Sequence, residues 1–159
     1  MRAEPMTSFN EREVSRARLD AIDWSEVTTA YGDASVVPSW LFDFVHADLD
    51  AAERAGGQLW AALCHQHAYV SSAALPALPW ILEALRRTEE ELVVEALDIL
   101  LGFVVCTDDT DEAASPWKRE LREGVRAAIP VLRPLVSSEC EDIAYFAGRI
   151  LEELGASYT

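Results

Sequence analysis

Three stretches of this 159-residue sequence decide its fold: V-P-S-W-L-F-D-F at residues 37–44, L-P-W-I-L-E-A-L at 78–85 and I-P-V-L-R-P-L at 129–135. In each stretch an aliphatic residue and a proline open a helical pattern, and a second, capped helical pattern follows. The prolines Pro38 and Pro79 are 41 residues apart, and Pro130 follows after a further 51. A period of about 40 residues built from helix pairs predicts a helical repeat architecture.

Outward from these stretches, every long segment has helical periodicity and strand signals are nearly absent. The predicted N-caps are Asn10, Asp50, Thr88 and Ser138, and Gly32 is expected to close a short helical segment. Pro79 and Pro130 are expected to kink their helices. We therefore predict about seven helices, at residues 10–22, 38–48, 50–67, 72–85, 88–106, 116–136 and 138–155, besides the short segment at 25–32.

The repeated pattern P-x-x-L-x-x-L, followed by a turn and A-x-x-x-L or its equivalent, resembles a divergent HEAT repeat. The resemblance covers about residues 37–155 and implies an all-α fold, a short HEAT-like α-solenoid of about three helix pairs. The pairs are expected at about 37–70, 72–106 and 116–155, within one continuous domain at 37–159. Residues 1–36 are expected to form an N-terminal cap helix and a short helical segment.

A narrower resemblance involves C-H-Q-H-A-Y-V-S-S-A-A-L-P-A-L-P-W at 64–80, preceded by A-Y-G at 30–32. It is similar to a group of bacterial HEAT-like proteins in which H-Q-G-x-x-Y-x-A-T runs into a proline-containing helix. This chain departs from that pattern at His67 and at Ser72–Ala73, so no site residue is transferred from it. The resemblance implies a binding scaffold, and some members of the group resemble immunity proteins of toxin gene clusters.

The acidic charge is concentrated in the middle of the chain. The whole sequence has 13 basic and 28 acidic residues, a formal net charge of −15. Residues 23–115 contain 17 of the acidic residues and three basic ones, a net charge of −14, whereas residues 1–22 are neutral. Such a field disfavours nucleic acid and anionic membranes and favours a cationic partner, although the carboxylates also suit plain solubility.

The N-terminal sequence lacks the apolar stretch of a signal peptide, and the apolar run 99–106 is too short to span a bilayer. The three cysteines, Cys64, Cys106 and Cys140, are expected to be free thiols. We therefore expect a cytoplasmic protein, without a membrane partner, that is a monomer or a weak dimer.

Few residues suggest chemistry. Cys64 and His67 would share one helix face and could supply two zinc ligands, but two further ligands at suitable spacing are missing, so we expect no metal site and no cofactor. Asp108, Asp109 and Asp111 resemble the start of a calcium loop that lacks the required glycine and final glutamate. No nucleotide-binding or hydrolase motif occurs. We therefore expect that the chain is not an enzyme.

The second helix of each pair is expected to line the concave side, where such scaffolds hold partners. Glu91, Glu95 and Asp98 fall at i, i+4 and i+7 and form one acidic stripe. The other candidate residues for partner binding are Glu53 and Trp60 in the first repeat, Asp142 and Tyr145 in the third, and Asp108, Asp109, Asp111 and Glu112 in the acidic loop. The alternative is that Trp60 packs between repeats and the carboxylates form a solvated face.

The sequence thus leads to one hypothesis and one alternative. The first is a non-enzymatic scaffold whose acidic face masks a basic protein, as an immunity protein or inhibitor masks a toxin or enzyme. The alternative is an accessory or regulatory scaffold that binds a peptide or a small cationic ligand.

Overall fold

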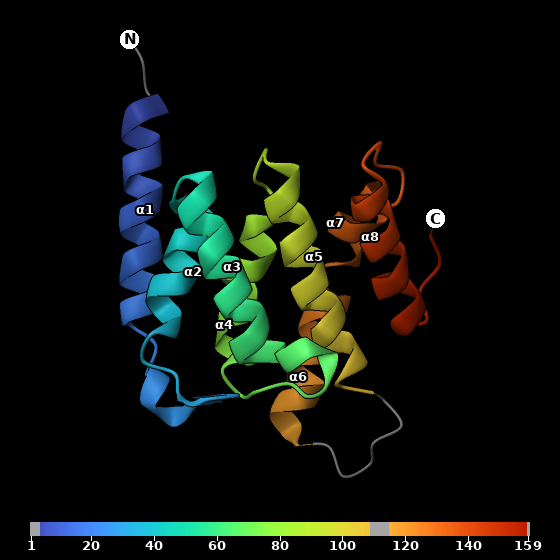
Figure 1. The fold of residues 1–159 in the computed structure, drawn as a ribbon, viewed down its shortest axis with the longest axis horizontal. Helices are drawn as coiled ribbons and strands as arrows, with labels where there is room; N and C mark the ends of the chain where they lie inside the picture. Colours follow the sequence, from blue (N-terminus) through green and yellow to red (C-terminus); the bar gives the residue numbers. More distant parts are fainter. Residues whose placement is uncertain (1–3, 109–114, 159) are drawn as a thin grey trace.

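The computed structural model describes residues 4–108 and 115–158, and these ranges are almost entirely helical (Figure 1). Within them lie eight α-helices, two short 3₁₀-helices and one pair of two-residue strands, so the predicted all-α class is confirmed. The α-helices are α1 (Glu4–Asp20), α2 (Val37–His46), α3 (Leu49–Cys64), α4 (Ala74–Ala84), α5 (Glu90–Val105), α6 (Pro116–Arg126), α7 (Ile129–Leu135) and α8 (Glu141–Glu153).

The helices form two rows that follow the order of the chain from α1 to α8 (Figure 1). In one row α3 packs against α5, and α5 packs against α8. In the other, α1 packs against α2, α2 against α4, and α4 against α6. Contacts between α2 and α3, α4 and α5, and α7 and α8 join the two rows. This arrangement places α3 and α5 side by side, and the candidate site lies between them.

Helix α5 is the centre of the core. Ten of its residues are buried, between Leu92 and Val104, and they cover more than one side of the helix. This burial is the consequence of its position, because α3, α4, α6 and α8 all pack against it. A helix whose apolar residues cover more than one side is typical of such enclosure.

The segment between α1 and α2 differs from the short helix predicted at 25–32. Only η1 (Trp24–Glu26) is helical, with Asp23 as its N-cap. The strands β1 (Thr28–Thr29) and β2 (Gly32–Asp33) then form a small antiparallel hairpin. Gly32 has a φ of 109° and so serves a hairpin turn instead of ending a helix. The threonines favour extended backbone, which explains why the helical prediction was wrong here.

Two predicted N-caps fall inside helices. Helix α1 begins at Glu4, six positions before Asn10. At α3 the carboxylate of Asp48, and not that of Asp50, accepts a hydrogen bond of 3.0 Å from the Ala51 amide. Asp50 therefore lies in the first turn, where a negative charge is favoured by the helix dipole but does not cap the helix.

Two further starts move by one or two residues. The N-cap of α5 is Glu89, immediately after the predicted Thr88. The N-cap of α8 is Cys140, and the Ser138 hydroxyl accepts a hydrogen bond of 3.1 Å from its amide. The predicted polar residues thus mark the turns correctly without occupying the cap positions.

The helix predicted over 116–136 is two helices. α6 ends at Arg126 and α7 begins at Ile129, with Pro130 in the first turn of α7. Pro130 has no amide hydrogen for the carbonyl four residues earlier, that of Arg126, and its ring clashes with this carbonyl, so α6 ends at Arg126. At Pro79, by contrast, α4 continues through the proline.

Two arginines tie helix ends together. The Arg87 guanidinium donates to the carbonyl oxygens of Phe44 at 3.1 Å and Ala47 at 2.7 Å, at the end of α2. Arg122, 5% exposed, donates at 2.8 Å to the carbonyl oxygens of both Val104, in the last turn of α5, and Thr107, just after it. These carbonyls lie at helix ends, where backbone partners are few, so each arginine satisfies acceptors that would be costly to bury without a donor.

Candidate functional site

Helices α3 and α5 approach each other closely at two glycines. A Cβ atom on Gly56 would lie 2.9 Å from Cγ of Glu95, and one on Gly102 would lie 2.8 Å from Sγ of Cys64 and from Cδ2 of His67. Real side chains do not tolerate such distances, so only glycine permits this packing. The close approach brings the polar residues of both helices into one group.

The turn after α3 contributes His67. The helix ends at Cys64, and η2 (His65–His67) follows, with a positive φ of 62° at His67. The Nε2 atom of His67 lies 2.8 Å from Oδ1 of Asp98 and donates to the Asp98 carbonyl oxygen at 2.9 Å. The hydrogen bond to the Asp98 side chain raises the pKa of His67, although burial lowers it. His67 therefore pairs with α5 instead of facing solvent.

Trp60 lies beside this pair on α3. Its ring centroid is 6.3 Å from that of His67, and its Nε1 atom is buried without a hydrogen-bond partner among the described residues. An unsatisfied buried donor is uncommon in folded proteins, so the indole N–H is one more polar group of this region that lacks compensation.

Cys64 lies beneath the same group. It is fully buried, and its Sγ atom donates to the carbonyl oxygen of Trp60 at 3.4 Å. Burial, and then the negative charge of Asp98, raise the pKa of the Cys64 thiol far above its usual value. A thiol that stays protonated is a poor nucleophile and a poor metal ligand. The geometry therefore gives Cys64 a packing role.

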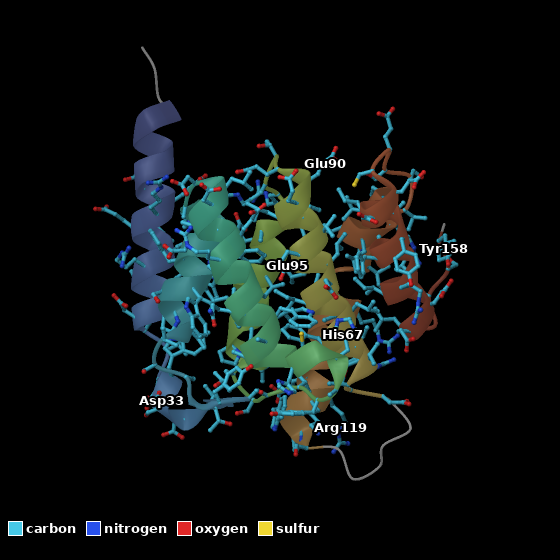
Figure 2. The ribbon with its side chains drawn as sticks, in the orientation of Figure 1. Asp33, His67, Glu90, Glu95, Arg119 and Tyr158 are labelled. Atoms are coloured by element: carbon cyan, nitrogen blue, oxygen red, sulfur yellow. The ribbon has the colours of Figure 1, made fainter. Side chains whose placement is uncertain are left out.

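Glu95 is the acidic centre of the group. Burial, followed by the nearby charges of Asp98 and Glu53, raises the pKa of its carboxyl. Neither Glu95 nor Glu53 has a cationic partner among the residues that the structure describes. Figure 2 shows Glu95 and His67 at the centre of the view, over α3 and α5.

We call the five residues Glu53, Trp60, His67, Glu95 and Asp98 the Glu95 cluster. Its electrostatics favour a cation, because two of its three carboxylates are not neutralised by the protein itself. An aromatic face beside carboxylates suits a guanidinium or ammonium group. Within residues 4–108 and 115–158, no three histidine, cysteine or acidic residues are arranged to hold a metal ion.

Four of the predicted partner-binding residues, Glu53, Trp60, Glu95 and Asp98, thus lie together. Glu91 is exposed in the first turn of α5, near its outer end, and the charges that act on Glu95 do not include it. Glu91 keeps the predicted helical spacing with Glu95 and Asp98 on α5, and Glu53 joins Glu95 and Asp98 from α3.

The remaining predicted residues lie elsewhere. Asp142 is exposed in the first turn of α8, and Tyr145, 58% exposed, lines a separate cavity of about 190 Å³ with Tyr158. Asp108 is exposed after α5, and Asp109, Asp111 and Glu112 lie outside the described residues.

Sequence reasoning missed the roles of Gly56, Gly102 and His67 in this group. Glycine inside a strongly helical pattern signals close packing, so Gly56 and Gly102 could have been noticed. The pairing of His67 with Asp98 has no local signal, because the two residues are 31 positions apart and meet only through packing.

Comparison of the chain with protein families, with curated proteins and with solved structures finds no match. None of the described helices is long and apolar enough to cross a membrane.

Proposed function

We propose that this chain is a non-enzymatic, HEAT-like scaffold that binds a basic protein through the Glu95 cluster, in the manner of an immunity protein or inhibitor. The two rows of helices support the repeat interpretation, since they keep corresponding helices in contact along the chain. The net charge of −14 over residues 23–115 supports a cationic partner.

The observation that carries the proposal is the uncompensated carboxylate of Glu95. Burial of a charge costs free energy unless an opposite charge or several hydrogen bonds compensate for it. Here burial acts together with two further carboxylates nearby, which raises the cost. A cationic group from a partner would remove that cost on binding, and this gain in free energy would favour the complex.

The cluster also favours arginine as the recognised residue. A planar guanidinium can bond two carboxylate oxygens at once and stack on an indole ring, and Glu53, Glu95 and Trp60 provide both kinds of contact. Lysine offers one compact charge without the planar surface. The proposal therefore predicts a preference for arginine-rich over lysine-rich segments.

The binding experiment uses nine-residue peptides of arginine and of lysine, titrated calorimetrically against the full chain at several salt concentrations. The test variant is Glu53→Gln with Glu95→Gln, which spares Asp98 because that residue pairs with His67. The matched control is Glu139→Gln with Glu141→Gln, which changes the charge equally at two exposed positions near the start of α8. Loss of two charge-assisted contacts should weaken binding of the arginine peptide at least about tenfold.

The control variant should bind within about twofold of the unchanged chain, because scattered surface charges contribute little. Equal losses in the two variants, or equal affinity for the two peptides, would show that only net charge acts, and would refute the Glu95 cluster as a site.

The inhibitor role has its own test, which is co-expression with the product of the neighbouring reading frame. The proposal expects that product to be lethal alone, harmless with this chain, and lethal again with the charge-reversed Glu53→Lys, Glu95→Lys variant. If the neighbouring product is harmless, the inhibitor role is refuted. The binding role is then tested by the peptide titration alone.

A further inference from the structure

A second polar site lies on the other row of helices, where α1 meets α2 and α4. A cavity of about 410 Å³ opens there, a volume within the range of small-molecule sites. It is lined by Asn10, Glu11, Val14, Ser15 and Arg18 of α1, His46 of α2, and Pro79, Trp80, Glu83 and Arg86 from α4 and the residues after it. None of these residues belongs to the Glu95 cluster.

The base of the cavity holds a buried hydroxyl and an imidazole. Ser15 is 9% exposed, and its Oγ atom lies 2.9 Å from Nε2 of His46. Burial and then the Arg12 charge lower the pKa of His46, so the ring is neutral at neutral pH. Arg12 holds this arrangement by donating to the His46 carbonyl oxygen at 3.1 Å. The pair can therefore reorganise to donate a hydrogen bond to a ligand.

Arg18 and Trp80 supply further donors. The Cζ atom of Arg18 lies 4.9 Å from the centre of the Trp80 ring, and the guanidinium has no carboxylate partner among the described residues. Trp80 is 3% exposed overall, and its Nε1 atom, which has no hydrogen-bond acceptor among the described residues, is not completely enclosed. Stacking fixes the plane of the guanidinium and leaves its N–H groups free to bind an oxyanion.

The acidic residues of the cavity do not cancel this charge. Glu83 already pairs with Arg86, at 3.5 Å. Glu11 is then the carboxylate of the lining that remains to balance the charge of Arg18. Glu11 and Arg18 are seven positions apart on α1, a separation of about 10 Å along the helix axis. The end of the cavity nearer Arg18 is therefore rich in donors, and the faces of Pro79 and Trp80 add apolar surface.

We propose that this cavity binds a small organic oxyanion, a carboxylate or phosphate ester with an apolar body, through the Arg18 guanidinium, the Trp80 indole N–H and the Ser15 hydroxyl. The oxyanion would accept from these three donors while its apolar body packs against Val14 and Pro79. In a chain with a net charge of −15, such a site distinguishes the N-terminal part from the acidic middle. This proposal is independent of the Glu95 cluster.

The test follows the indole N–H signal of Trp80 by two-dimensional ¹⁵N NMR, assigned with a Trp80→Phe variant. The probes are benzoate, phenyl phosphate and inorganic phosphate at constant ionic strength, with benzamide as the neutral isostere of benzoate. Benzoate or phenyl phosphate should shift the Trp80 signal saturably. The probe that binds with the higher affinity identifies the class of oxyanion. Benzamide should leave the signal in place.

Two variants and one control test the assignment of donors. Arg18→Gln should lower the affinity for the preferred probe about tenfold, which is the scale of one charge-assisted contact. Ser15→Ala should lower that affinity less. Arg54→Gln, at an exposed position of α3, makes the same charge change away from the cavity and should leave the affinity unchanged. No saturable shift with any anion, equal binding of benzamide, or equal losses in the two arginine variants would overturn the proposal.

Discussion

The Nε2 atom of His67 lies 2.8 Å from Oδ1 of Asp98, and this ion pair joins the turn after α3 to the middle of α5. Because Gly102 of α5 packs against the same histidine, the pair and the glycine together fix the distance between the two helices. The cluster of carboxylates therefore depends on a contact that also stabilises the fold.

Stability should depend on pH through this pair. The folded pKa of His67 is raised above its ordinary value of 6.5, so its contribution is complete below pH 6.5 and is lost as the pH rises through the folded pKa. The side chains are 26% and 27% exposed, so the contribution should be at most about 1 kcal/mol. The measurement is the free energy of unfolding of the unchanged chain and of Asp98→Asn, by urea, between pH 5.5 and 9.

The two curves should be furthest apart below pH 6.5 and converge at high pH. His67→Asn provides the control, since asparagine tolerates positive φ and does not titrate. In that background, Asp98→Asn should make a difference that does not vary over the same pH range. A constant gap between the first two curves would contradict a charged His67 in the folded protein.

Gly102→Ala should destabilise the chain by about 1–3 kcal/mol, the range for overpacking a core. Its Cβ would lie 2.8 Å from atoms of both Cys64 and His67, within an interface of two helices. Gly57→Ala is the matched control, because a Cβ there meets no atom of the described residues within 4 Å. Alanine at that helical position should instead stabilise by about 0.5–1 kcal/mol, and thermal or urea unfolding would reveal the opposite signs.

Arg122→Met should cost roughly 3 kcal/mol or more, because it leaves several buried carbonyl oxygens without a donor. These oxygens belong to Thr107 after α5 and to Glu153 at the end of α8, and the Val104 oxygen in the last turn of α5 would keep only the Thr107 amide, at 3.4 Å. The comparison variant is Arg54→Met, exposed on α3, which should change the free energy of unfolding by less than about 0.5 kcal/mol. Similar urea midpoints for the two variants would rule out this bonding role.

The sequence predicted the helices well and their ends less well. Apolar periodicity reports which face of a segment is buried, and so it located the helix α5. Caps depend on which of several neighbouring polar residues reaches a free amide. Asp48 and Asp50 are equivalent by residue type, and only the backbone geometry selects Asp48. At Pro130 the sequence predicts a kink where the structure has a break, because the residue types alone do not distinguish a kinked helix from two helices.

The candidate site was predictable where it lies on one helix. The spacing of Glu95 and Asp98 follows from helical geometry, and both lie on the side of α5 that meets α3. The addition of Glu53 depends on how α3 and α5 are aligned along each other, which the packing at Gly56 sets. Charge counts gave the sign of the field but could not reveal which carboxylate was left uncompensated.

Glu95→Gln should stabilise the free protein at neutral pH. The folded pKa of Glu95 is raised above 4.5, so its protonated form is favoured by folding, and the resulting stability is lost as the pH rises through the folded pKa. At pH 7 the carboxylate therefore costs free energy, and glutamine, which is uncharged, should recover roughly 1 kcal/mol. Below pH 4.5 the advantage should disappear.

The comparison variant is Glu141→Gln, exposed in the first turn of α8, which should not stabilise the chain at pH 7. Urea unfolding at pH 4 and pH 7 separates the two variants. The same Glu95→Gln variant should bind the arginine peptide more weakly, so that stability and binding change in opposite directions. A variant that is less stable at pH 7 would mean that a cation within the chain already compensates Glu95, which would remove the basis for its role in binding.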